Sequence, residues 1–174
     1  EARALTASPA GIFAYTLHPN GSAVAYVATE PADPAKDCLR GRGFNADVYE
    51  ENIPDRNVYI RALPDGPVRR MTEGVSVFDI TWSPDGKYIA AAVAEENTVD
   101  QSYMFKRIHL LDPVSGMLAP LVDNPGKLGE MAWSPDSRQL AFVSAVAPWD
   151  SKDGSIFVAD VPRCKPFSSL RNYS

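Results

Sequence analysis

Cysteine is scarce in this sequence: 174 residues contain only Cys38 and Cys164, far apart in the chain. Neither belongs to a C-x-x-C spacing, so the cysteines give no sign of a zinc site or a redox motif. A disulfide between them would need Cα atoms within about 7 Å of each other, and nothing in the sequence favours that pairing. We therefore expect no metal site and no cofactor.

Long hydrophobic runs and an excess of positive charge are also missing. No apolar segment approaches the roughly 20 residues that cross a bilayer, and the N-terminus lacks the basic-then-apolar pattern of a signal peptide. The formal net charge is −5, so no basic surface is expected to attract nucleic acid or anionic lipid. We expect a soluble protein with neither a membrane nor a nucleic-acid partner, and its compartment, cytoplasmic or periplasmic/secreted, stays open.

Two common catalytic and nucleotide-binding signatures are absent as well. The chain has no G-x-S-x-G turn to present a serine nucleophile. It also has no G-x-x-x-x-G-K-[ST] loop to hold phosphates. We therefore expect this chain to contain no catalytic residues of its own.

Turn residues, by contrast, are plentiful, since 15 prolines and 11 glycines separate short apolar runs. This pattern is typical of an all-β protein with many turns. One hairpin occurs in three copies: ITWSPDGKYIA at 80–90, MAWSPDSRQLA at 131–141 and, more loosely, YTLHPNGSAVA at 15–25. In each copy Pro and Asp or Asn build a tight turn between two strands. Asp85 and Asp136 are therefore predicted to be turn residues rather than catalytic acids, and His18, in the same hairpin, is predicted to be structural.

Each hairpin is followed by two further strand-like segments. The third strands are predicted at 58–61, 108–111 and 156–159, and the fourth at 68–72, 118–122 and 167–170. His109 lies within the second of these third strands and is predicted to be structural. A repeated four-stranded meander fits a propeller blade better than a solenoid coil.

The predicted fold class is therefore all-β, a partial β-propeller over residues 1–174. It consists of about three four-stranded antiparallel blades, at 9–74, 75–126 and 127–174, and one extra N-terminal strand at 1–8. That strand is predicted because ARALT at 2–6 resembles the fourth strand VRRMT at 68–72. Known propellers need at least about four blades, so we expect either a fragment of a longer protein or self-association through open blade faces and edges.

The long loops indicate where a binding site would lie. In an antiparallel meander, the loops between second and third strands share one end of the blades, and here they are long and polar, at about 29–56, 95–106 and 147–154. Glu50 and Glu51 beside Tyr49 are candidates to hold a cationic group such as a peptide amino terminus. The commoner alternative is a solvated loop whose carboxylates pair with Arg40, Arg42 or Arg56. Arg40 and Arg42 are also candidate ligand contacts in their own right. Trp149 is a further candidate, either as a ligand-stacking residue or as a cap on the blade.

The motifs WSPDGKYIA and WSPDSRQLAF, with fourth strands such as RRMT and RALT, resemble the propeller of prolyl oligopeptidase-type serine peptidases, the dipeptidyl and acylaminoacyl peptidases included. They also resemble the propeller of TolB. The peptidase resemblance implies a non-catalytic domain that gates and recognises small peptides above an α/β-hydrolase domain, which this chain lacks. VYEE at 48–51 is similar to the acidic pair with which dipeptidyl peptidases grip the substrate amino terminus, although here it precedes a third strand rather than a new WSP hairpin.

Two rival hypotheses remain. A TolB-like module would bind protein through a propeller face without any enzymatic domain, whereas a truncated reading frame would give a self-associating module with no evolved function. A downstream G-x-S-x-G in the parent reading frame favours the peptidase. A frame that ends after the propeller favours the binding module.

Overall fold

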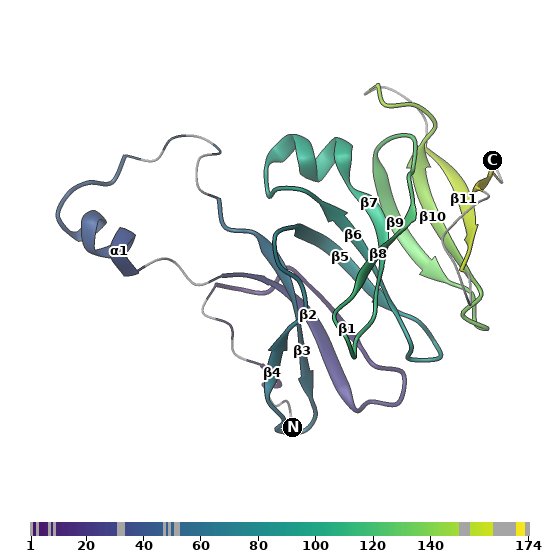
Figure 1. The fold of residues 1–174 in the computed structure, drawn as a ribbon, viewed down its shortest axis with the longest axis horizontal. Coiled ribbons are helices and arrows are strands. Elements are labelled where there is room, and N and C mark those ends of the chain that lie inside the picture. The colour runs from purple at the N-terminus through teal and green to yellow at the C-terminus, as the bar shows by residue number, and fades with distance from the viewer. Residues whose placement is uncertain are drawn as a thin grey trace.

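The computed structural model describes residues 2, 4–6, 8, 10–30, 34–46, 48, 50, 53–149, 154–161 and 170–172, the last three for their backbone only. The described chain folds into three separate four-stranded sheets. Within each sheet, every strand pairs antiparallel with the next strand in sequence. The sheets stand side by side, as Figure 1 shows. Three antiparallel meanders therefore confirm the predicted fold class.

The strand bounds follow the sequence repeat closely. The first sheet holds β1 (Ala14–Leu17), β2 (Ala23–Thr29), β3 (Arg56–Ala62) and β4 (Val68–Arg70). The second holds β5 (Ser76–Trp82), β6 (Ile89–Ala94), β7 (Arg107–Leu111) and β8 (Leu118–Val122). The third holds β9 (Leu128–Trp133), β10 (Gln139–Ala145), β11 (Gly154–Asp160) and β12 (Leu170–Asn172). We call these sheets blades 1, 2 and 3.

Two features differ from the expectation. None of the described residues of the segment 1–8, which are 2, 4–6 and 8, lies in a strand. A fourth strand forms beside a third strand, and among the described residues each third strand, β3, β7 and β11, already pairs with its own fourth strand. The loops also contain two short helices that no repeat indicated: α1 (Pro34–Gly41) and the π-helical turn η1 (Gln101–Phe105).

The WSPD segments form self-supporting turns. In blade 2 the Ser83 hydroxyl donates to Asp85 Oδ1 at 2.7 Å and accepts from the Tyr88 N–H at 3.0 Å. In blade 3 the Ser134 hydroxyl donates to Asp136 Oδ1 at 2.6 Å, and this bond is the main reason why the pKa of Asp136 is lowered. Partial burial raises the pKa of Asp85, but its bonds to Ser83 and to the Lys87 N–H outweigh this, so the net change is a lowered pKa. These carboxylates stay ionised and hold turns, as a structural role requires.

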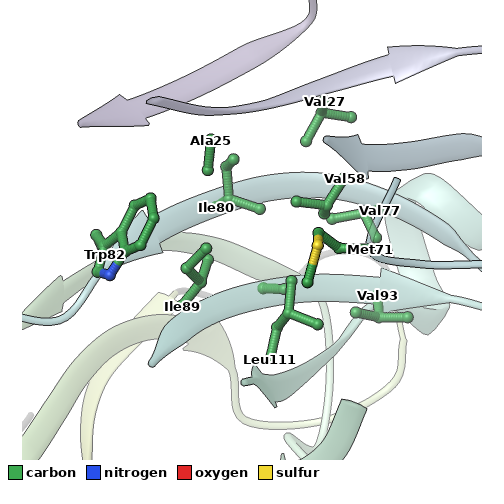
Figure 2. Close-up of a cluster of buried hydrophobic side chains, with 11 residues drawn as sticks. Ala25, Val27, Val58, Met71, Val77, Ile80, Trp82, Ile89, Val93 and Leu111 are labelled. Carbon is green, nitrogen blue, oxygen red and sulfur yellow. The ribbon is translucent and has the colours of Figure 1, made fainter. Parts of the chain in front are cut away.

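Blades 1 and 2 pack face to face through one apolar cluster. Side chains of β2 and β3 point toward those of β5, β6 and β7, as Figure 2 shows. Its buried members are Ala25, Val27, Val58, Met71, Val77, Ile80, Trp82, Ile89, Ala91, Val93 and Leu111. A second cluster joins β6, β7 and β8 of blade 2 to β9, β10 and β11 of blade 3. Each four-stranded sheet is stabilised by its neighbour, which is the packing rule of repeat folds.

Two equivalent glycines differ in how closely the turn between β1 and β2 approaches them. Gly21 and Gly86 occupy the same place in successive hairpins, with φ of +75° and +73°. A Cβ at position 21 meets nothing within 4 Å, whereas one at position 86 would lie 2.5 Å from His18 Nε2. His18 is held edge-on to Trp82, with ring centroids 4.8 Å apart, so it has little room to move.

We expect Gly21→Ala to lower the free energy of unfolding by about 1 kcal/mol, from backbone strain alone. Gly86→Ala should lower it by about 2–3 kcal/mol, because the His18 contact adds a packing cost. Urea unfolding of both variants measures the difference. Equal losses would contradict a close approach of His18 to Gly86.

Candidate functional site

The long loops of blades 1 and 2 lie at the same end of the molecule and contact each other. We call this the long-loop end; in Figure 1 the loop that carries α1 and the loop that carries η1 both project from it. The Asn97 side chain donates to the Pro54 carbonyl at 2.9 Å, and the Val99 N–H donates to the Glu50 carboxylate. The loop of one blade therefore holds the loop of the next.

A cavity of about 360 Å³ opens beside these loops, on the side of blade 2 that faces blade 1. Its lining combines an apolar base with polar groups of both charges. The lining residues are Val75, Val93, Ala94, Glu95, Gln101, Phe105, Arg107 and His109. This volume and this mixture are typical of small-ligand or side-chain pockets.

Arg107 fixes the wall of the cavity. Its Nε donates to Asp123 Oδ1 at 2.8 Å, and its Nη1 donates to the carbonyls of Met104 and Lys106. The guanidinium therefore connects η1 to the start of β7 by hydrogen bonds. His109 Nδ1 lies 3.3 Å from the Arg107 carbonyl, which can only accept, so this nitrogen is the donor. Burial lowers the pKa of His109, so near neutral pH the ring is uncharged and Nε2 is an acceptor.

A second group of side chains lies at the same end and combines two cations with two aromatic rings. The Arg56 guanidinium lies 4.1 Å from the centroid of the Phe13 ring and 5.1 Å from that of Phe78. The Lys106 ammonium lies 5.8 Å from the Phe78 centroid. We call Phe13, Arg56, Phe78 and Lys106 the cation–aromatic cluster.

Both cations in this cluster are partly desolvated. Burial lowers the pKa of Arg56. Burial is also the main reason for the lowered pKa of Lys106; the Arg56 charge lowers it further, and Asp79 opposes the shift. Each cation remains charged at neutral pH. Lys106 and Arg56 are thus close enough to repel each other.

A hydrogen-bonded network supports the base of the first long loop. The carboxylate of Glu30, where that loop leaves β2, accepts from the Tyr59 hydroxyl at 2.7 Å and pairs with Arg70 at 3.1 Å. Burial and then the bond to Glu30 raise the pKa of Tyr59 to about 12. The buried Asn57 accepts from the Thr72 hydroxyl at 3.0 Å and donates to Glu30 at 3.4 Å. This network ties the loop to the connection between β4 and β5.

The residues predicted from the sequence are only partly placed. Glu50 lies at the contact between the two loops, with φ of 57°, whereas Tyr49 and Glu51 lie outside the described residues. Arg40 is in the exposed helix α1 and Arg42 follows that helix. Trp149 is 63% exposed, and both of its predicted roles stay predictions.

The cation–aromatic cluster was not predicted, although Arg56 was named as a possible partner for the acidic pair. Its four members come from positions 13, 56, 78 and 106, each at the long-loop end of a strand. The one signal in the sequence that could have predicted the cluster is that all four residues lie near the start of a first or third strand of a blade. Cys38 is exposed and unpaired. Across the described ranges, no group of three or more His, Cys, Asp or Glu is placed to hold a metal ion, and no helix has the length and apolarity to cross a membrane.

The sheets and their packing define the class of protein: the chain is part of a β-propeller. No protein-family model matches the sequence, and no curated protein matches it either. Solved structures do match. The putative TolB from Agrobacterium tumefaciens is 15% identical with a TM-score of 0.60, over 95% of this chain and 49% of that one.

Two other solved propellers match similarly. The β-propeller domain of the Trilobed protease from Pyrococcus furiosus is 19% identical with a TM-score of 0.57, over 87% of this chain and 39% of that one. TolB from Acinetobacter baumannii is 15% identical with a TM-score of 0.55, over 91% of this chain and 31% of that one. The chain thus spans less than half the length of these structures. At these identities the likeness concerns the fold.

Proposed function

We propose that this chain is the non-catalytic propeller portion of a prolyl oligopeptidase-type serine peptidase, in which the long-loop end recognises and gates small peptides. The observation that carries the proposal is the contact between the long loops of blades 1 and 2 beside the 360 Å³ cavity. A cavity that offers an apolar base, Glu95 and His109 can accept a peptide side chain and hydrogen-bond its backbone. The likeness to a protease propeller supports the same choice.

Within this function, Glu50 and Glu51 are proposed to bind the free amino terminus of the peptide, with Tyr49 beside them. Glu50 belongs to the inter-loop contact, and a carboxylate has a second oxygen with which to accept from an ammonium group. The backbone of Glu50 has a positive φ of 57°, an uncommon conformation for a non-glycine residue and one often found where function constrains the chain.

The test compares short peptides with a free and an acetylated amino terminus. We expect the free form to bind at least about tenfold more tightly, and Glu50→Gln with Glu51→Gln to abolish that preference, since a charge-assisted bond contributes about 1.5–3 kcal/mol. Calorimetric titration of the 174-residue chain measures it. Asp65→Asn, in the exposed turn between β3 and β4, is the control and should leave the preference intact. Equal binding of both peptide forms by the unmodified chain would reject the amine clamp.

The rival function is a TolB-like module that binds a folded protein partner. The likeness to two TolB propellers favours it at the level of the fold. Such a module would bind no short peptide in the titration above. Its parent reading frame would lack a hydrolase domain with G-x-S-x-G, which sequencing of the downstream DNA decides.

A further inference from the structure

The cation–aromatic cluster brings two positive charges close together beside the ring of Phe78. Within the described part of the chain, neither Arg56 nor Lys106 forms an ion pair. Arg56 Nε is buried and has no hydrogen-bond partner. Desolvated cations in folded proteins are normally paired, because the cost of losing water is otherwise uncompensated. Arg56 and Lys106 are both half-buried, so each keeps part of its hydration and can still accept an anionic partner from solution.

The aromatic rings compensate only part of this cost. The rings of Phe13 and Phe78 attract the charges through their π-faces, which is a real but modest stabilisation. A ring offers no lone pair to the in-plane N–H donors of the guanidinium. Those donors are the ones that fit the two oxygens of a carboxylate. Ring contact and carboxylate binding are therefore compatible on the same side chain.

We propose that Arg56 and Lys106 form a binding site for a single carboxylate group, that of a peptide ligand at the long-loop end. Arg56 binds the carboxylate through its terminal nitrogens, and Lys106 supplies the second positive charge. The apolar parts of the ligand pack on Phe13, which is 49% exposed.

The surroundings favour a carboxylate over a phosphate. Asp79 is close enough to affect Lys106, and Asp55, next to Arg56 in sequence, accepts from the Ser76 hydroxyl at 2.6 Å. These carboxylates repel a dianion more strongly than a monoanion. The balance of two cations against nearby acids suits a ligand with one negative charge. As a peptide site it rests on the proposed function, whereas the carboxylate chemistry can be tested without peptides.

The first arm of the test uses N-acetylated alanine tripeptides that end in a free carboxylate or in an amide. We expect the carboxylate form to bind at least about tenfold more tightly and to shift the NMR signal of the Arg56 Nε–H group. Arg56→Gln and Lys106→Gln should each remove most of that difference. Lys87→Gln, in an exposed turn at the opposite end of blade 2, is the matched control and should change nothing.

The second arm uses acetate alone, compared with chloride and phosphate at equal ionic strength. Acetate should raise the Tm of the unmodified chain by about 2 °C or more, because a ligand that binds only the folded state stabilises it. The Arg56→Gln and Lys106→Gln variants should lose this effect. Should Arg56→Gln fail to fold, Arg56→Lys keeps the charge but loses the fork of donors, and it is expected to weaken acetate binding without abolishing it.

The outcomes separate the two proposals. Peptide binding that is equal for the carboxylate and amide forms and insensitive to both variants would overturn the carboxylate site and leave the peptide function standing. No peptide binding, with acetate stabilisation that depends on Arg56 and Lys106, would support the site and reject the peptide function. Phosphate acting as strongly as acetate through the same residues, or no stabilisation by acetate, would overturn the choice of a carboxylate.

Discussion

Phe142→Ala is expected to lower the free energy of unfolding by about 3–5 kcal/mol, among the largest losses that a single core substitution causes. Phe142 is 1% exposed and belongs to the cluster between blades 2 and 3. Its ring stacks on that of Phe157, with centroids 5.5 Å apart. Removal of the ring leaves a cavity at the contact between two sheets, which neither sheet can close alone.

The matched control is the next residue on the same strand. Val143 points to the opposite face of β10 and is 39% exposed, so Val143→Ala should cost less than about 1 kcal/mol. Urea unfolding compares the two variants. Hydrogen exchange adds a spatial readout, because Phe142→Ala should reduce protection in β10 and β11 more than in β2 and β3. A loss below about 1 kcal/mol for Phe142→Ala would show that blade 3 does not depend on blade 2.

The strands were predictable because their signals are local and repeated. The two WSPD turns place the serine and aspartate at fixed offsets, and the same bonds form in both copies. Alternating apolar residues then determine which side of each sheet is buried. The helix α1 escaped prediction for a different reason: it has only eight residues and none of them is buried, so it lacks the length and the packing that make a helix predictable.

The candidate site was predictable only as a region. Antiparallel topology alone placed the long loops at one end, and the structure confirms that those of blades 1 and 2 meet there. The partners within that region depend on how neighbouring blades pack. Arg56 and Lys106 belong to different blades and meet through the ring of Phe78, a contact that no spacing in the sequence encodes.

The same reasoning identifies which buried polar groups support the long-loop end. Asn57 and Thr72 are 0% and 5% exposed, yet both are polar, and both lie where strands pass into loops at this end. Buried polar groups are tolerated when all their bonds are made. Here the bonds connect Glu30, at the start of the first long loop, with the connection that leads into blade 2.

Thr72→Val should therefore lower the free energy of unfolding by about 2–3 kcal/mol, although the two side chains have nearly the same shape. The Thr72 hydroxyl accepts from the Val58 N–H at 3.0 Å and donates to Asn57 Oδ1 at 3.0 Å, so its loss leaves two buried groups without this partner. Thr72→Ser keeps the hydroxyl and loses only a methyl group, and it should cost less than about 1 kcal/mol.

Urea unfolding of the two variants separates the hydroxyl from the methyl group. If Thr72→Ser proves as destabilising as Thr72→Val, packing of the methyl group is the dominant contribution and the hydrogen-bonded network is not. If only Thr72→Val is destabilised, the network sets the stability of the loop base. Peptide binding by Thr72→Val should then weaken as well, because Glu30 and the loop that follows it lose an anchor that lies outside the binding site.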